Sequence, residues 1–72
     1  MDTGNIVVGS VLIGDDLDIT PLPLLLASGV DIIGVDEKGF RLRRRHPSYN
    51  GEEFFLTMDA MRKSHWIIAP TE

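Results

Sequence analysis

The sequence predicts a small α+β domain, in which a mostly antiparallel sheet of four to five short strands packs against one or two short helices. Three observations predict this class. The chain has only 72 residues, its β-branched segments are short and bounded by glycine, and its two helical segments are each only a few residues long. A chain of this length forms one domain, residues 1–72, and buries only about 60% of the surface that its unfolded chain exposes.

The first predicted elements are apolar segments that are bounded or interrupted by glycine. Residues 6–13 are short and β-branched, which predicts a buried strand. Gly9 inside this strand indicates a bulge or a close backbone approach. Thr20 is expected to cap a short apolar helix whose first position is Pro21, and Gly29 is expected to end that helix in the left-handed conformation.

A hairpin is predicted next. Residues 30–35 and 40–45 have strand character, and the turn between them contains Gly39, which is expected to take a positive φ. Residues 46–51 have the composition of a loop.

The last elements allow two interpretations. In the first, residues 54–56 form a strand, Thr57 caps a short helix over 58–63, and 65–69 form the final strand. In the second, residues 52–63 form one continuous helix. Periodicity alone does not separate the two.

The charge distribution indicates a partner that is steered electrostatically. The net charge is −4, from seven Lys and Arg against eleven Asp and Glu. Residues 1–37 contain seven acidic and no basic residues, whereas residues 38–72 contain all seven basic residues and four acidic ones. The alternative is that the two halves pair with each other in the fold.

Several classes of site are excluded by the sequence. The chain has no cysteine, which removes disulfides, thiolate metal sites and cysteine nucleophiles. Residues 9–14 carry two glycines but are followed by Asp15-Asp16, whose carboxylates would repel phosphate, so this is not a P-loop. The two histidines, His46 and His65, have no zinc-ligand spacing. We therefore expect no catalytic residue, no metal, no cofactor and no enzymatic activity.

The location is expected to be cytoplasmic. Residues 1–4 lack the basic segment that begins a secretory signal. The longest apolar stretch, residues 21–35, is interrupted by Gly29 and Asp31, so no membrane interaction is predicted.

An arginine-rich strand supplies the best candidate for a binding site. Phe40 and Leu42 should face the core, which places Arg41, Arg43 and Arg45 on the opposite face over about 13 Å. Such a row suits an acidic protein surface or a small phosphorylated ligand, and the negative net charge argues against direct nucleic-acid binding. The alternative is a solvated edge strand protected by charge. The predicted partner-binding residues are the arginines Arg41, Arg43, Arg44 and Arg45, the loop anchor Tyr49, and an acidic turn of Asp15, Asp16 and Asp18.

Two resemblances bear on function. The segment from Arg41 to Ile68, with its basic strand, Pro47, Leu56-Thr57, short helix and Trp66, resembles bacteriophage anti-defence proteins that sequester nucleotide signals. The size, the lack of cysteine and the polarised charge are similar to phage host-takeover proteins, above all small regulators that bind bacterial RNA polymerase.

These resemblances imply a non-catalytic inhibitor in the host cytoplasm that binds a host protein, first of all bacterial RNA polymerase, and blocks transcription by occlusion. The alternative is an oligomeric protein that sequesters a phosphorylated nucleotide.

Overall fold

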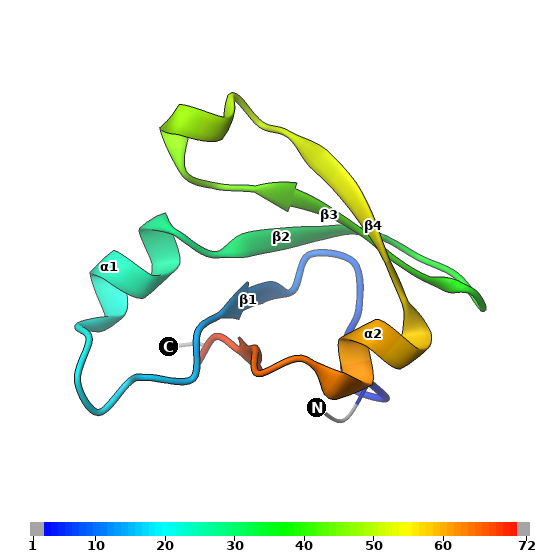
Figure 1. Cartoon of the computed structure of the whole chain (residues 1–72), viewed down its shortest axis with the longest axis horizontal. Helices are drawn as coiled ribbons and strands as arrows, with labels where there is room; N and C mark the ends of the chain where they lie inside the picture. Colours follow the sequence, from blue (N-terminus) through cyan, green and yellow to red (C-terminus); the bar gives the residue numbers. More distant parts are fainter. Residues whose placement is uncertain (1–2, 71–72) are drawn as a thin grey trace.

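The computed structural model describes residues 3–70, which form one five-stranded antiparallel sheet in the order β4-β3-β2-β1-β5 (Figure 1). Two short α-helices and one 3₁₀ turn complete it, so the predicted α+β class is confirmed. The elements in chain order are β1 Val11–Ile13, α1 Leu22–Ala27, β2 Val30–Val35, β3 Gly39–Arg44, η1 Pro47–Tyr49, β4 Glu53–Thr57, α2 Met58–Lys63 and β5 Ile67–Ile68.

Strands β2, β3 and β4 form a continuous meander, whose first two strands are the predicted hairpin. In its centre Leu42 of β3 is paired with Ile32 of β2 and with Phe54 of β4. The first turn is closed by the Asp36 carboxylate, which accepts from the backbone N–H groups of Lys38 (2.7 Å) and Gly39 (3.0 Å). The predicted strand 40–45 is confirmed, except that it begins and ends one residue earlier.

The predicted strand 6–13 is wrong over its first half. Only Val11–Ile13 form β1, because Gly9 takes a φ of +97° and turns the chain. The Gly9 N–H still donates to the carbonyl of Ile32 (2.9 Å), which is the close backbone approach expected there. As a result Val7 and Val8 are about 60% exposed instead of buried.

Both predicted ends of the first helix need correction. Helix α1 begins at Leu22, so Pro21, not Thr20, occupies its N-cap position, and the Thr20 hydroxyl donates to the Asp16 carboxylate at 2.7 Å. Gly29 does not take a positive φ. Its role is steric, because a Cβ there would lie 2.5 Å from the carbonyl oxygen of Leu12.

The short-helix interpretation of the C-terminal region is confirmed, and the continuous helix over 52–63 is wrong. Strand β4 runs to Thr57, whose hydroxyl accepts from the Ala60 N–H at 3.1 Å and so caps α2. The final strand is shorter than predicted and covers only Ile67–Ile68.

The sheet has a core on each face. Leu12 packs with Phe40, Leu42 and Met61 on the face that α2 covers, whereas its neighbour Ile13 packs with Leu25 of α1 on the other face. Because successive strand residues point to opposite faces, the two helices lie on opposite sides of the sheet. Helix α1 packs on β1, so it leaves β2, β3 and β4 open on its own side.

Candidate interaction face

The open side of β2, β3 and β4 carries most of the predicted arginine row. Phe40 and Leu42 are buried to 1% and 0% exposure, so Arg41 and Arg43 point to the opposite side, as predicted. We call this surface the uncovered face. Its side chains are Asp31, Arg41, Arg43, Arg45, Glu53 and Phe55.

Two of the three arginines on the uncovered face are paired within the chain. Arg43 Nη2 lies 2.8 Å from Glu53 Oε2 on the neighbouring strand, and Arg45 Nη1 lies 3.7 Å from Asp31 Oδ1. The Arg43 hydrogen bond lowers the pKa of Glu53, and the same bond raises the pKa of Arg43. The alternative given for the charge distribution, that the two halves of the chain pair with each other, therefore holds for Asp31 and Arg45.

Arg41 differs from its neighbours. No Asp or Glu carboxylate of residues 3–70 lies within ion-pair distance of it. Its direct cross-strand partner is Phe55, whose side chain is 47% exposed. A hollow of about 220 Å³ lies between Arg41, Glu53, Phe54 and Phe55. The uncovered face thus presents a guanidinium that has no ion pair among residues 3–70, beside an exposed aromatic ring.

Arg44 and Tyr49 form a separate contact. The Arg44 Cζ atom lies 4.7 Å from the Tyr49 ring centroid and 4.8 Å from the Phe54 ring centroid, so two aromatic rings hold the guanidinium. Its Nε atom is buried without a hydrogen bond and lies 3.6 Å from a Glu52 carboxylate oxygen. Side chains alternate between the two faces of a strand, so Arg44 points to the same face as Phe40 and Leu42 and does not lie on the uncovered face.

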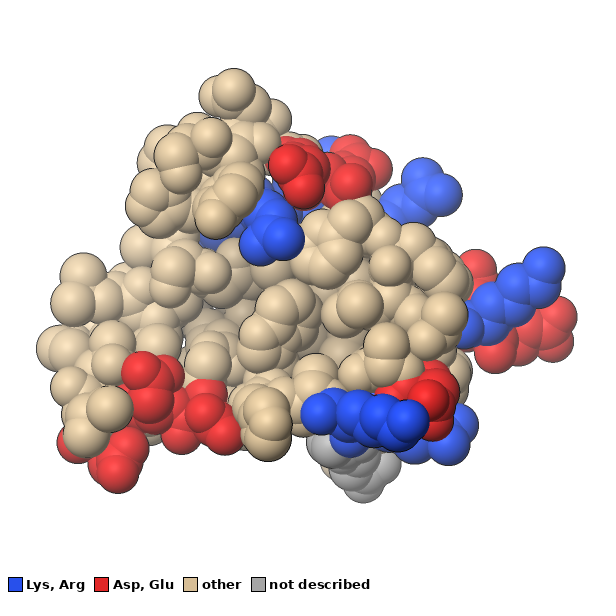
Figure 2. Space-filling view, in the orientation of Figure 1, with Lys and Arg blue, Asp and Glu red and all other residues tan. Residues whose placement is uncertain are grey.

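The acidic turn lies elsewhere on the molecule. Asp15, Asp16 and Asp18 precede α1, and Figure 2 shows acidic side chains gathered at the α1 end, apart from Lys and Arg in this view. Asp16 accepts from Thr20, whereas Asp15 and Asp18 are exposed. Three exposed apolar side chains that were not predicted from the sequence lie near this turn in the chain. They are Leu17, Ile19 and Leu24, at 41%, 79% and 62% exposure.

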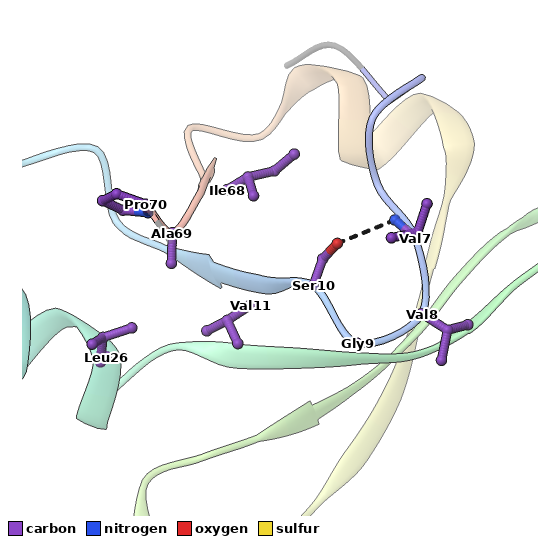
Figure 3. Close-up of a pocket in the computed structure, with 9 residues that line it drawn as sticks. All are labelled: Val7, Val8, Gly9, Ser10, Val11, Leu26, Ile68, Ala69 and Pro70. Atoms are coloured by element: carbon purple, nitrogen blue, oxygen red, sulfur yellow. Dashed lines mark hydrogen bonds between the residues drawn. The ribbon is translucent and has the colours of Figure 1, made fainter. Parts of the chain in front are cut away.

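An apolar groove of about 450 Å³ lies along the N-terminal turn and β1 (Figure 3). The one polar side chain in its lining is that of Ser10, whose hydroxyl already accepts a hydrogen bond from the Val7 N–H at 3.2 Å. The groove offers apolar contact area and no reactive group. It is lined by Val7, Val8, Gly9, Ser10, Val11, Leu26, Ile68, Ala69 and Pro70.

The part of the chain that the structure describes contains neither a candidate metal site nor a membrane-spanning helix. Residues 3–70 contain no group of three His, Asp or Glu side chains that could hold a metal ion. Within the same residues, neither helix has the length and hydropathy needed to cross a bilayer.

Comparisons with protein-family models, with characterised proteins and with solved structures found no match. Both resemblances to phage proteins therefore stay predictions, and the geometry of the uncovered face carries the functional argument.

Proposed function

We propose that this chain is a non-catalytic regulatory protein that binds a host protein through its uncovered face and blocks that protein by occlusion. One observation carries the proposal. Arg41 has no ion pair among residues 3–70, and it stands beside the exposed ring of Phe55 on a face that no described helix covers.

The pair has the chemistry of a protein–protein contact. Arginine and aromatic side chains dominate binding energy in interfaces, because the aromatic ring supplies apolar area and the planar guanidinium binds carboxylates through two hydrogen bonds. The partner surface should therefore offer a carboxylate next to an apolar patch. Arg43 and Arg45 already have carboxylate partners, and exposed ion pairs of this kind contribute little because solvent screens them. We assign them to the rim of the contact.

We assign the acidic turn one of two roles. It makes a second contact with the same partner, or it repels proteins that are not the partner. Asp15 and Asp18 are exposed beside the apolar side chain of Ile19. Complementary charge mainly sets the association rate and the specificity. Bacterial RNA polymerase is the first partner to test, on the ground of the resemblance to phage regulators.

The test compares two variants that each remove one positive charge. Purified RNA polymerase is passed over the immobilised wild-type chain, over Arg41→Ser and over Lys63→Ser, and an untreated bacterial lysate is analysed in parallel by mass spectrometry. Lys63 is the matched control, because it lies on α2 on the other side of the sheet and pairs with Asp59.

We expect Arg41→Ser to weaken binding of the captured protein at least about tenfold and Lys63→Ser to leave it unchanged. Equal binding by Arg41→Ser and the wild type would remove the uncovered face from the proposal. Capture of a host protein other than RNA polymerase, with the same dependence on Arg41, would support the binding mode and replace the first partner.

The alternative, sequestration of a phosphorylated nucleotide, has weaker support. The hollow beside Arg41 contains a single guanidinium and also the Glu53 carboxylate, which opposes phosphate. A rise in melting temperature with added nucleotide, lost in Arg41→Ser, would favour this alternative.

A further inference from the structure

The two edges of the sheet are not equally protected. At one edge β5 contains only two residues and is followed closely by Pro70, which has no N–H to donate. At the other edge β4 contains five residues with neither proline, Lys nor Arg. Natural edges are usually shortened or guarded by such residues, because an open strand pairs readily with another chain.

The hydrogen-bonding groups on the outer side of β4 can be identified from the ladder with β3. The Arg44 N–H donates to the Glu52 carbonyl, and the Met58 N–H donates to the Lys38 carbonyl. In an antiparallel pair the residues that bond across alternate with those that do not. Phe54 and Leu56 therefore bond to β3, and the backbone groups of Glu53, Phe55 and Thr57 point away from the sheet.

The side chains of β4 are apolar on both faces at its centre. Phe55 is 47% exposed on the uncovered face, and Phe54 and Leu56 are partly buried on the core face. A strand with outward backbone groups and apolar side chains has the properties of an interface.

We propose that β4 pairs antiparallel with β4 of a second copy of this chain, with Phe55 of each copy on the two-fold axis. This register pairs all five strand residues. Phe55 stands opposite Phe55 of the second copy, Glu53 opposite Thr57, and Phe54 opposite Leu56. The outward backbone groups of Phe55 then bond to their symmetry equivalents across the axis.

Charge and the number of backbone hydrogen bonds favour this register over two alternatives. No like charges stand directly opposite each other in it, whereas a register centred on Glu53 would place two carboxylates face to face, which destabilises a strand pair. A register centred on Phe54 pairs only residues 53–55 of the strand, so it forms fewer bonds.

The dimer would extend the uncovered face. Directly opposed residues in a sheet point to the same side, so the two uncovered faces would join on one side of a continuous sheet. The two Phe55 rings would meet in the middle, with an Arg41 beyond each. The inference does not depend on any host partner, so its failure would leave the proposed function standing.

Cross-linking tests the register, since the chain contains no cysteine. Phe55→Cys would place two thiols on the axis with Cα atoms about 5.5 Å apart, within disulfide range. The matched control is Glu53→Cys, on the same strand and face, whose symmetry equivalents lie about 14 Å apart. We expect Phe55→Cys to form a disulfide dimer on oxidation at least about tenfold faster than Glu53→Cys. Equal rates would overturn the register.

Light scattering tests whether the chain forms a dimer without a cross-link, because it measures the mass of the wild-type protein directly. The wild-type chain is expected to have twice the mass of one copy, and Phe55→Lys to have the mass of one copy, because a lysine at the edge opposes pairing. Leu24→Lys is the control, since it replaces a similarly exposed apolar residue on α1 with the same charge. Circular dichroism establishes that each variant is folded. A monomeric wild type, or loss of the dimer in Leu24→Lys, would overturn the proposal.

Discussion

The guanidinium carbon of Arg44 lies 4.7 Å from the centroid of the Tyr49 ring, so the loop after β3 is held to the strand by a cation–π contact. Phe54 supplies a second ring on the guanidinium, at 4.8 Å. The loop residue that the sequence suggests as a surface anchor is thus also a structural contact.

Tyr49→Ala is expected to lower the free energy of unfolding by about 0.5–1 kcal/mol, because it removes a partly exposed cation–π contact. Tyr49→Phe keeps the ring and should have little effect. Urea unfolding of both variants measures the difference. Equal losses in the two variants would assign the effect to the Tyr49 hydroxyl and contradict the prediction.

Thr57→Ala is expected to destabilise the protein by about 1 kcal/mol, because it removes the side-chain acceptor for the Ala60 N–H at the start of α2. Thr57→Ser keeps a hydroxyl and serves as the control. Thermal unfolding followed by circular dichroism checks the order of stability. A stable Thr57→Ala with a weakened Thr57→Ser would show that the hydroxyl is not what matters.

Gly29→Ala is expected to cost about 1–3 kcal/mol, the usual range for overpacking, because the added methyl group meets the backbone oxygen of Leu12 at 2.5 Å. Gly34→Ala is the matched control, since its methyl group would meet the Arg41 Cβ atom at 3.3 Å. Chemical denaturation should show a clearly smaller loss for Gly34→Ala. The reverse order would mean that the approach of α1 to β1 is not rigid.

Glu53 is expected to titrate below its ordinary pKa of 4.5, because the Arg43 hydrogen bond favours the carboxylate. A carboxyl whose pKa is lowered by folding stabilises the protein above the unfolded value, and this contribution is lost as the pH falls through the folded value. NMR titration of the Glu53 side chain measures the shift. Arg43→Gln should return the pKa towards 4.5 by more than Arg41→Gln, since Arg41 acts only through weaker charge attraction.

Most of the sheet was predictable because its signals are local. In β3, alternation places Phe40 and Leu42 in the core and the arginines outside, and the neighbouring strands are close in sequence. The same holds for the α2 cap, where Thr57 and Ala60 are three residues apart.

The predictions were wrong where contacts between residues far apart in the sequence determine the local structure. Val7 and Val8 have strand character, but the turn at Gly9 and its bond to Ile32 end the strand there. Gly29 suits a left-handed helix end, and only the position of β1 shows that it is needed for close packing.

The candidate site was predicted in part. Alternation correctly places Arg41 and Arg43 on one face, but the carboxylates that neutralise Arg43 and Arg45 come from neighbouring strands, whose register the sequence does not specify. For the same reason the sequence does not place Phe55 beside Arg41, although the two residues are paired on the open side.

The order of assembly follows from the placement of β1 between β2 and β5. The meander β2-β3-β4 is continuous in the chain, whereas Leu12 of β1 pairs with Ile68, which is 56 positions further along. Closing so long a loop costs more chain entropy than forming a hairpin. We expect the meander to form first and the β1–β5 pair to close last, so that a nascent chain whose residues 67–68 are still inside the ribosome would expose the unpaired edge of β1.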